Sequence, residues 1–286
     1  MNIVNIHARV AAARQRLRAA GLSPNESDLS ARLLAEHVLG WTTERLLTDG
    51  SGGEPPDFYD RFEALVSRRA SREPLHYIVG HREFWGLDFE VTPAVLIPRP
   101  ETELLVEATL ARVPAAAAAT VADLCTGCGC VGIAIAHERR DARVIATDIS
   151  GEALMVARRN ADRLGVGDRV EILRGDLVEP FETICDVIVA NPPYVVLGAR
   201  PALQPEVRDH EPDVALFGGD DGLRLVDRLV REAPSRIRSG GWLIFEFGLG
   251  QDEEIENMIA ASPELTLVDL ERDLQGIARA AVTRRL

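Results

Sequence analysis

Residues 121–136 of the chain read VADLCTGCGCVGIAIA. The first residues form an apolar run of strand length, Gly127 and Gly129 lie in the turn after it, and the apolar residues that follow begin a helix. Glycine lets a ligand come close to the backbone, and the first N–H groups of a helix have no partners within it. This order of strand, glycine turn and helix predicts an α/β sheet that binds a nucleotide-like ligand at its edge.

Acidic residues follow two later strands of the same predicted sheet. The strand Arg143–Thr147 is followed by Asp148, at roughly the offset where an acidic residue binds ribose hydroxyls in dinucleotide folds. A third strand, Val170–Leu173, is followed closely by Asp176, which is placed to reach an adenine edge. These positions predict a site for an adenosine group.

The glycine spacing by itself leaves two ligand classes open. Gly127, Gly129 and Gly132 match the Gly-x-Gly-x-x-Gly pattern of dinucleotide sites. S-adenosyl-methionine has one ribose, one adenine and no phosphate, so its site needs carboxylates more than it needs an anion-binding helix end. The pair Asp148 and Asp176 therefore favours S-adenosyl-methionine.

A strand-like run at residues 185–190, CDVIVA, is followed directly by Asn191-Pro192-Pro193-Tyr194. Proline has a fixed φ and no N–H, so this turn presents hydrogen-bond acceptors and few donors. Acceptors in a rigid frame suit a planar NH2 group, with the ring of Tyr194 packed on its plane. The pattern predicts a site that alkylates an amide or an aryl amine, and a plain strand-ending turn is the other interpretation.

Several motifs together resemble those of the release-factor glutamine methyltransferases, the HemK/PrmC family. The resemblance covers most of the chain. The motifs are PLHYIVG at 74–80, REFW at 82–85, LIPRPETE at 96–103, DLCTGCG at 123–129, NPPY at 191–194, EP at 211–212 and GGDDG at 218–222.

The resemblance implies an α/β enzyme with a Rossmann-like class I methyltransferase sheet, a small N-terminal helical domain and a connecting β-hairpin. It implies S-adenosyl-methionine as the cofactor. The cofactor-binding residues would be Cys125, Thr126, Gly127, Cys128, Gly129, Asp148, Asp176, Leu177 and Asn191. The catalytic residues would be Asn191, Pro192 and Tyr194, and the substrate-binding residues would be Asn191, Pro192, Pro193 and Tyr194.

The acceptor that the resemblance implies is the glutamine of the Gly-Gly-Gln loop of class I translation release factors. The chain departs from the family loop Asp-Leu-Gly-Thr-Gly-Ser-Gly, because Cys125 replaces the first glycine and Cys128 the serine. Cysteines at 125 and 130 are more like the related enzyme that methylates a glutamine of a large-subunit ribosomal protein, whereas residues 98–103 are like the release-factor branch. Glutamine methylation fits both interpretations, and the acceptor protein stays open between them.

An Asn-Pro-Pro-Tyr turn also occurs in enzymes that methylate the exocyclic amine of adenine in nucleic acids. Such enzymes extrude a base and grip the surrounding phosphates, which requires clustered positive charge. This chain has a net charge of -13 and its basic residues are spread out. We therefore expect no direct nucleic-acid binding, and this third activity is the least favoured.

Three of the four cysteines, Cys125, Cys128 and Cys130, lie within six positions. Structural zinc normally has four ligands, and Cys185 lies on a distant strand. Small residues at a strand-to-helix turn explain the cluster more simply. We predict no metal site, and a disulfide between Cys125 and Cys128 under oxidation is left open.

The expected organisation has three parts. Residues 1–80 predict a helical substrate-recognition domain, residues 81–98 a β-hairpin linker, and residues 99–286 the methyltransferase domain, with an antiparallel pair near its end. The chain is 46% hydrophobic, yet it contains no apolar run of spanning length and no export signal. We expect a cytoplasmic monomer whose protein partners are class I release factors.

Overall fold

The computed structural model describes residues 5–116 and 118–286. The chain forms two compact units. The first contains the residues up to Gly80 together with Gln204–His210, and the second contains His81–Leu203 and Glu211–Leu286. No helix within the two described ranges is long and apolar enough to cross a membrane.

The first unit is a set of helices around its own apolar core. Ser23 begins the second helix with a capping box, because its hydroxyl accepts the N–H of Glu26 and the carboxylate of Glu26 accepts the N–H of Ser23. The buried cluster includes Ile6, Leu17, Leu34, Phe58 and Phe62. The helices are α1 (Ile6–Ala19), α2 (Pro24–Leu39), α3 (Thr43–Asp49), α4 (Phe58–Ala70), α5 (Leu75–Val79) and α9 (Pro205–His210).

A buried ion pair joins α9 to α4 within this unit. Arg69 Nη1 donates to Glu206 Oε1 at 2.8 Å, and Arg72 Nη2 donates to Glu206 Oε2 at 2.6 Å. Burial by itself would raise the pKa of Glu206, but the hydrogen bonds from the two arginines outweigh it and the pKa is lowered. Arg69 is only 4% exposed, so its buried charge is balanced by a residue far along the chain.

The second unit contains a seven-stranded sheet with the strand order β10-β11-β9-β6-β3-β4-β5. The five strands from β9 to β5 in this order are parallel to one another, whereas β11 is antiparallel to both of its neighbours. The strand order reverses at β3, which lies between β4 and β6, and ligands bind at such a point in open α/β sheets. The strands are β3 (Thr120–Leu124), β4 (Arg143–Asp148), β5 (Val170–Arg174), β6 (Cys185–Ala190), β9 (Ile237–Glu246), β10 (Leu265–Arg272) and β11 (Ala278–Arg285).

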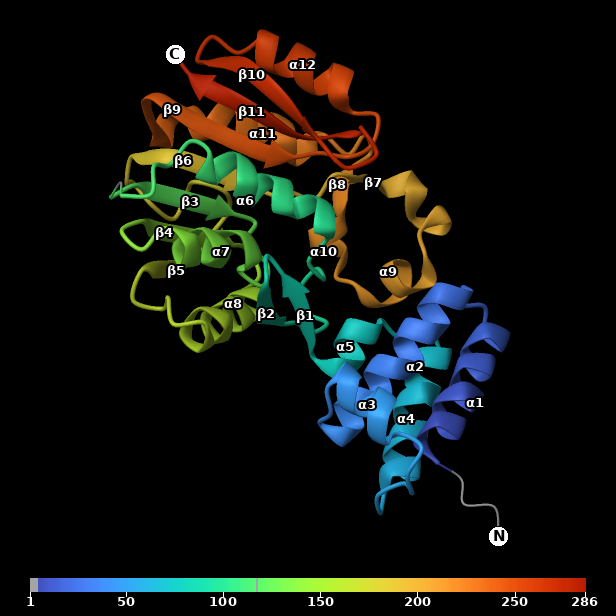
Figure 1. Ribbon diagram of the computed structural model, residues 1–286. Helices are drawn as coiled ribbons and strands as arrows, with labels where there is room; N and C mark the ends of the chain where they lie inside the picture. Colours follow the sequence, from blue (N-terminus) through green and yellow to red (C-terminus); the bar gives the residue numbers. More distant parts are fainter. Residues whose placement is uncertain (1–4, 117) are drawn as a thin grey trace. The chain divides into compact units, whose positions relative to one another are not determined.

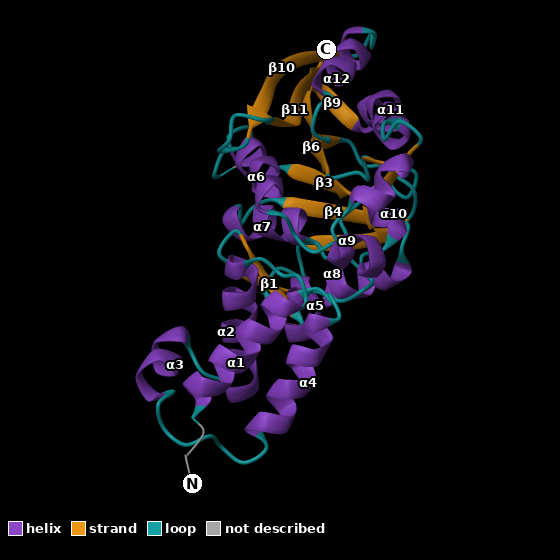
Figure 2. Ribbon diagram, turned by 90° about the vertical axis from the view of Figure 1, so that its right-hand side faces the viewer, coloured by secondary structure: helices purple, strands orange, loops and turns teal. Residues whose placement is uncertain are grey.

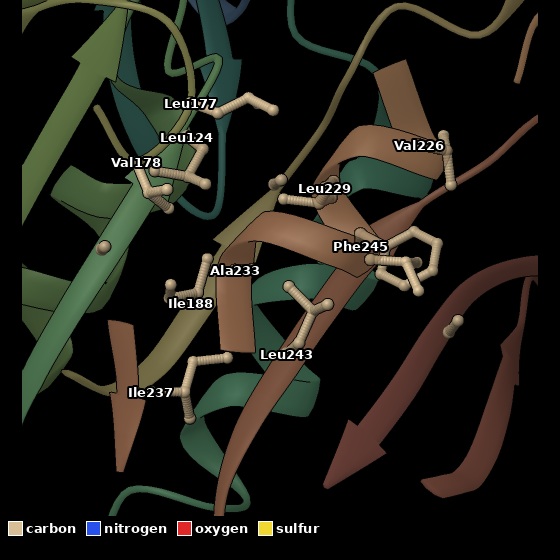
Figure 3. Packing of buried hydrophobic residues seen from close by; sticks show 14 of the residues in the cluster. Leu124, Leu177, Val178, Ile188, Val226, Leu229, Ala233, Ile237, Leu243 and Phe245 are labelled. Carbon is tan, nitrogen blue, oxygen red and sulfur yellow. The ribbon is translucent and has the colours of Figure 1, made fainter. Parts of the chain in front are cut away.

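Helices cover both faces of this sheet (Figures 1 and 2). On one face lie α6 (Glu103–Leu110), α7 (Cys130–Glu138) and α8 (Gly151–Arg163), and on the other lie α11 (Arg224–Glu232) and α12 (Asp252–Ala260). On the α11 side, Leu229 of the helix packs in one buried cluster with Ile188 of β6 and Leu243 of β9 (Figure 3). Burial on both faces explains why the central strands read as continuous apolar runs. The predicted fold class is confirmed.

Shorter elements complete the second unit. The strands β1 (His81–Phe84) and β2 (Leu87–Glu90) form an antiparallel hairpin. Asn160 of α8 accepts the N–H of Glu90 at 2.8 Å, which fixes the hairpin to the sheet's helical layer. The remaining elements are η1 (Pro100–Thr102), β7 (Val195–Val196), η2 (Leu197–Ala202), α10 (Asp213–Leu216), β8 (Phe217–Gly219) and η3 (Ala233–Arg236).

We predict that Glu206→Ala lowers the free energy of unfolding by about 3–5 kcal/mol, because it removes the carboxylate that balances the buried charge of Arg69. Denaturant unfolding of the full chain measures this. Asp28→Ala is the matched control, since Asp28 forms an exposed pair with Arg18 in the same unit and its loss should cost less than about 1 kcal/mol. Because the pKa of Glu206 is lowered on folding, its contribution is present above the unfolded pKa and disappears as the pH falls through the folded pKa. Equal destabilisation by the two variants would contradict the assignment.

Candidate active site

The carboxyl ends of four parallel strands lie at one level in the sheet. Leu124 of β3 pairs with Thr147 of β4 and with Ala190 of β6. Ala190 in turn pairs with Phe245 of β9. The residues that come next along these strands therefore lie side by side at this end of the sheet, and they are Cys125, Asp148, Asn191 and Glu246.

A cavity of ≈ 260 Å³ lies at this edge of the sheet. Nine of the residues predicted from the sequence line it: Cys125, Thr126, Gly127, Cys128, Asp148, Asp176, Leu177, Asn191 and Pro193. Gly129, Pro192 and Tyr194 are outside this lining, and Tyr194 lines a separate cavity beside Val195 and Gln251. The sheet thus brings together residues from four of its strand ends.

The glycine loop after β3 has room for a ligand on one side and none on the other. Gly127 has a φ of +56°, and a Cβ added there would meet nothing within 4 Å. Gly129 has a φ of +86° and precedes α7, and a Cβ added there would lie 2.6 Å from Cδ1 of Ile133. Gly127 therefore faces open space at the cavity, whereas Gly129 allows the loop to pack on α7. Cys125 has a φ of 57°, where glycine is usual, so this departure from the family loop keeps the backbone conformation at some cost.

Asp148 joins the glycine loop to the start of α8. Its Oδ2 accepts the N–H of Gly127 at 3.0 Å, and its Oδ1 accepts the N–H of Ser150 at 2.9 Å. Burial raises the pKa of Asp148, and the backbone hydrogen bonds oppose that shift. Each carboxylate oxygen has a second lone pair, so two hydroxyl donors at the cavity would still find acceptors here. These two acceptor oxygens fit the pair of hydroxyl groups of a ribose.

Asp123 is a buried carboxyl in the cavity wall that sequence reasoning missed as a site residue. Its Oδ2 accepts the hydroxyl of Thr126 at 2.5 Å and the N–H of Gly132 at 2.9 Å. Burial raises the pKa of Asp123 to about 7, although both hydrogen bonds act in the opposite direction. The signal in the sequence was an acidic residue inside an apolar strand, two positions before the loop.

Asp176 and Leu177, which follow β5, form part of the cavity wall. Arg228 Nη1 donates to Asp176 Oδ2 at 2.8 Å, a pairing that local sequence patterns could not reveal. Leu177 is buried with a φ of 47°, and its carbonyl accepts the hydroxyl of Thr147 at 3.1 Å. The apolar side chain of Leu177 and the remaining oxygen of Asp176 are the groups available to an adenine ring there.

The side-chain amide of Asn191 is held at its nitrogen by a hydrogen bond. Its Nδ2 donates to Thr102 Oγ1 at 3.1 Å, and Thr102 Oγ1 donates to Glu246 Oε2 at 2.7 Å. The hydroxyl of Tyr194 donates to the other oxygen, Glu246 Oε1, at 2.7 Å. Burial raises the pKa of Glu246, and these two hydrogen bonds act against the shift. Thr102 lies in the motif at 96–103 that the sequence analysis recognised, but neither Thr102 nor Glu246 was predicted as a site residue.

The glycine motif at residues 218–222 packs against the backbone of the turn at residues 191–194. A Cβ added to Gly218 would lie 2.5 Å from the carbonyl oxygen of Pro193, and one added to Gly222 would lie 2.3 Å from that of Tyr194. Only glycine permits these backbones to approach so closely. Arg99 also lines the cavity, and its Nη2 donates to the buried Glu211 at 2.7 Å, which fixes the guanidinium in the wall.

The cysteines are free thiols. Burial raises the pKa of Cys185 to about 12 and also raises the pKa of Cys125, whereas a hydrogen bond with Cys128, followed by burial, raises that of Cys130. Thiols held in the protonated form are poor nucleophiles and poor metal ligands. Among the residues that the structure describes, no cluster of three or more His, Cys, Asp or Glu side chains could hold a metal ion.

Comparison with known proteins relates this site to one family. The PrmC N-terminal domain family matches residues 10–80, and the methyltransferase small domain family matches residues 100–203. The release factor glutamine methyltransferase of Moorella thermoacetica is 44% identical over 235 residues, which are 80% of this chain and 83% of that protein. The enzyme of the same name from Cereibacter sphaeroides is 41% identical over 273 residues, or 96% of each chain.

Among solved structures, a methyltransferase from Pyrococcus furiosus has a similar fold, with a TM-score of 0.53 and 20% identity over 70% of this chain and 89% of that one. The predicted enzyme class and its cofactor, S-adenosyl-methionine, are confirmed. The identity and extent of the sequence matches establish that the chain belongs to the release factor glutamine methyltransferase family.

Proposed function

We propose that this enzyme methylates the side-chain amide nitrogen of a protein glutamine, in the Gly-Gly-Gln loop of class I translation release factors. The observation that carries the proposal is the anchored amide of Asn191 at the cavity edge. Because the NH2 group of Asn191 donates to Thr102, its oxygen is the atom left for an incoming ligand. An oxygen acceptor beside a cofactor cavity suits an amide NH2 group as the substrate.

The residues around the cavity would hold the cofactor in three parts. Asp148 offers its carboxylate to the ribose hydroxyls, and Leu177 and Asp176 lie where adenine would contact the wall. The loop of residues 125–129 would contact the methionine part, with Gly127 leaving the space for it. When bound, S-adenosyl-methionine supplies a methyl group that is already electrophilic because it is attached to a sulfonium.

The protein's own contribution is then orientation and exclusion of water. A glutamine amide is a weak nucleophile, since its nitrogen lone pair is delocalised into the carbonyl group. Asn191 Oδ1 and the carbonyl of Pro192 would accept the two amide hydrogens, hold the nitrogen in place and increase its electron density. No strong base is needed before attack, because the nitrogen becomes strongly acidic once it carries positive charge and its proton can pass to solvent as the product leaves the cavity.

We also propose that the enzyme acts in the cytoplasm as a monomer without direct nucleic-acid binding. The net charge of -13 supports the last part, since phosphate contacts need positive charge. The first unit is proposed to contact the body of the release factor, in keeping with the match of residues 10–80 to the PrmC N-terminal domain.

We predict that Asp148→Ala weakens binding of S-adenosyl-methionine at least about tenfold, because hydrogen bonds to a charged group are worth about 1.5–3 kcal/mol each. Burial raises the pKa of Asp148, so the wild-type affinity should decrease as the pH falls through that raised value and the carboxylate becomes protonated. The variant should depend less on pH. Calorimetric titration at several pH values measures both effects, with Asp168→Ala, exposed and outside the cavity, as the control. Unchanged affinity in a folded Asp148→Ala protein would sink the assignment.

We predict that Asn191→Ala leaves cofactor affinity within about twofold of wild type but lowers kcat for methyl transfer at least about tenfold, since about 1.4 kcal/mol of lost orientation suffices. Single-turnover transfer of labelled methyl measures the rate, and calorimetry measures the affinity. Asn257→Ala, on the exposed side of α12, is the control. A normal transfer rate in Asn191→Ala would rule out its role.

The acceptor itself is tested with the wild-type enzyme and labelled S-adenosyl-methionine. We expect label in a purified class I release factor, at the glutamine of its Gly-Gly-Gln loop, located by mass spectrometry. Large-subunit ribosomal proteins and adenine-containing oligonucleotides are offered in parallel. Label in either of these, with none in the release factor, would replace the proposed acceptor.

A further inference from the structure

Four side chains form a continuous hydrogen-bonded chain that begins in the cavity lining, with Asn191 and Thr102, and ends outside it, with Glu246 and Tyr194. They are Asn191, Thr102, Glu246 and Tyr194, with successive heavy-atom distances of 3.1, 2.7 and 2.7 Å. The four residues come from three separate places in the sequence, namely the turn after β6, the end of η1 and the last position of β9. Thr102 and Glu246 are each 2% exposed, so water does not complete their hydrogen bonds.

The direction of each hydrogen bond follows from the carboxylate. Burial opposes ionisation of Glu246, but the hydrogen bonds from Thr102 and Tyr194 favour its carboxylate form. In that form Glu246 has no hydrogen to donate and accepts from both hydroxyl groups. The two O···O distances of 2.7 Å match hydrogen bonds from a hydroxyl to a carboxylate. The single hydrogen of the Thr102 hydroxyl is then directed at Glu246, and Thr102 can only accept from Asn191.

This direction decides which end of the Asn191 amide meets the substrate. The oxygen and nitrogen ends of an asparagine amide have nearly the same shape, so packing alone does not distinguish them. An oxygen facing the cavity accepts a hydrogen from a substrate NH2 group, whereas a nitrogen there would oppose its own hydrogens to those of the substrate. The hydroxyl of Thr102 removes this ambiguity because it offers Asn191 only an acceptor.

We propose that Thr102 and Glu246 are positioning residues for methyl transfer, which hold the Asn191 amide with its oxygen toward the acceptor nitrogen, and that Tyr194 acts through its hydroxyl by satisfying the second oxygen of Glu246. This inference rests on the proposed function and deepens it. It gives Tyr194 a role in orienting Asn191, in place of the stacking expected from the sequence, in accord with its position outside the cavity lining.

The principal test is a pair of substitutions at Thr102. Thr102→Val keeps the shape and removes the hydroxyl, and Thr102→Ser keeps the hydroxyl and removes a methyl group. We expect Thr102→Val to lower kcat for glutamine methylation at least about tenfold, with the Kd for S-adenosyl-methionine within about twofold of wild type. Thr102→Ser should recover most of that loss. Equal losses in the two variants, or a loss confined to cofactor affinity, would overturn the proposal.

A double-mutant cycle distinguishes positioning from general support of the fold. In an Asn191→Ala background there is no amide to orient, so adding Thr102→Val should lower kcat by less than about twofold. A loss as large as that in the wild-type background would show that Thr102 acts elsewhere. If Asn191→Ala alone has no effect on kcat, the proposed function of the turn fails, and this result is distinct from failure of the positioning role.

Tyr194→Phe tests the other end of the chain without altering the cavity lining, and it serves even if a Thr102 variant does not fold. It removes one donor to Glu246 and keeps the ring. We expect a fall in kcat of about threefold or more that disappears in the Asn191→Ala background, in the manner of coupled residues. Full activity in Tyr194→Phe would overturn the part of the proposal that concerns this hydroxyl.

Discussion

The parallel pairing of β3 with its two neighbours is the constraint on which the site depends. Backbone hydrogen bonds fix Leu124 opposite Thr147 on one side and opposite Ala190 on the other, and the same register continues from Ala190 to Phe245. A slip of one residue in any of these strands would turn its polar terminal side chain to the other face of the sheet. The strand register therefore gathers Asp148 and Asn191, and the glycine loop and the glycines at 218 and 222 complete the cavity around them. The cavity thus needs strands of the right length that end in the right residues.

This dependence explains why so much of the site could be predicted. Asp148 and Asn191 each follow a largely apolar strand-like run, so the charged or amide side chain marks the end of the strand. Glu246 stands at the equivalent point of β9, but it lies between Phe245 and Phe247, and an apolar residue on each side hides the end of the strand from any reading of hydrophobic pattern. Its partners on η1 and on the turn after β6 are distant in sequence, so only the structure could assign a role to it.

The same reasoning accounts for what local patterns could not give in the first unit. Nothing in the sequence around Glu206 pairs it with Arg69, which lies 137 positions earlier. Buried charges are satisfied by whatever group the fold brings to them, and such long-range pairs leave no periodic trace. The consequence is that Gln204–His210 groups with the N-terminal helices, within a range that the sequence assigned to the methyltransferase domain. The glycines at 218 and 222 could be recognised in the sequence as part of a motif. The reason for them, the close approach of the carbonyl groups of Pro193 and Tyr194, is visible only in the structure.

The glycine spacing left a dinucleotide open as the ligand, and the hydrogen bonds of the loop now decide between the two classes. A pyrophosphate needs free N–H groups at the start of the helix. Here the N–H of Gly132 donates to Asp123 and the N–H of Gly127 donates to Asp148. Two carboxyl groups thus occupy donors that a phosphate would need, and once ionised they would also repel it. Burial raises the pKa of both acids. A positively charged sulfonium and ammonium in the cavity would act in the opposite direction and favour the ionised carboxylates. The loop that resembles a phosphate site in sequence is, by its own hydrogen bonds, a site for a cationic ligand.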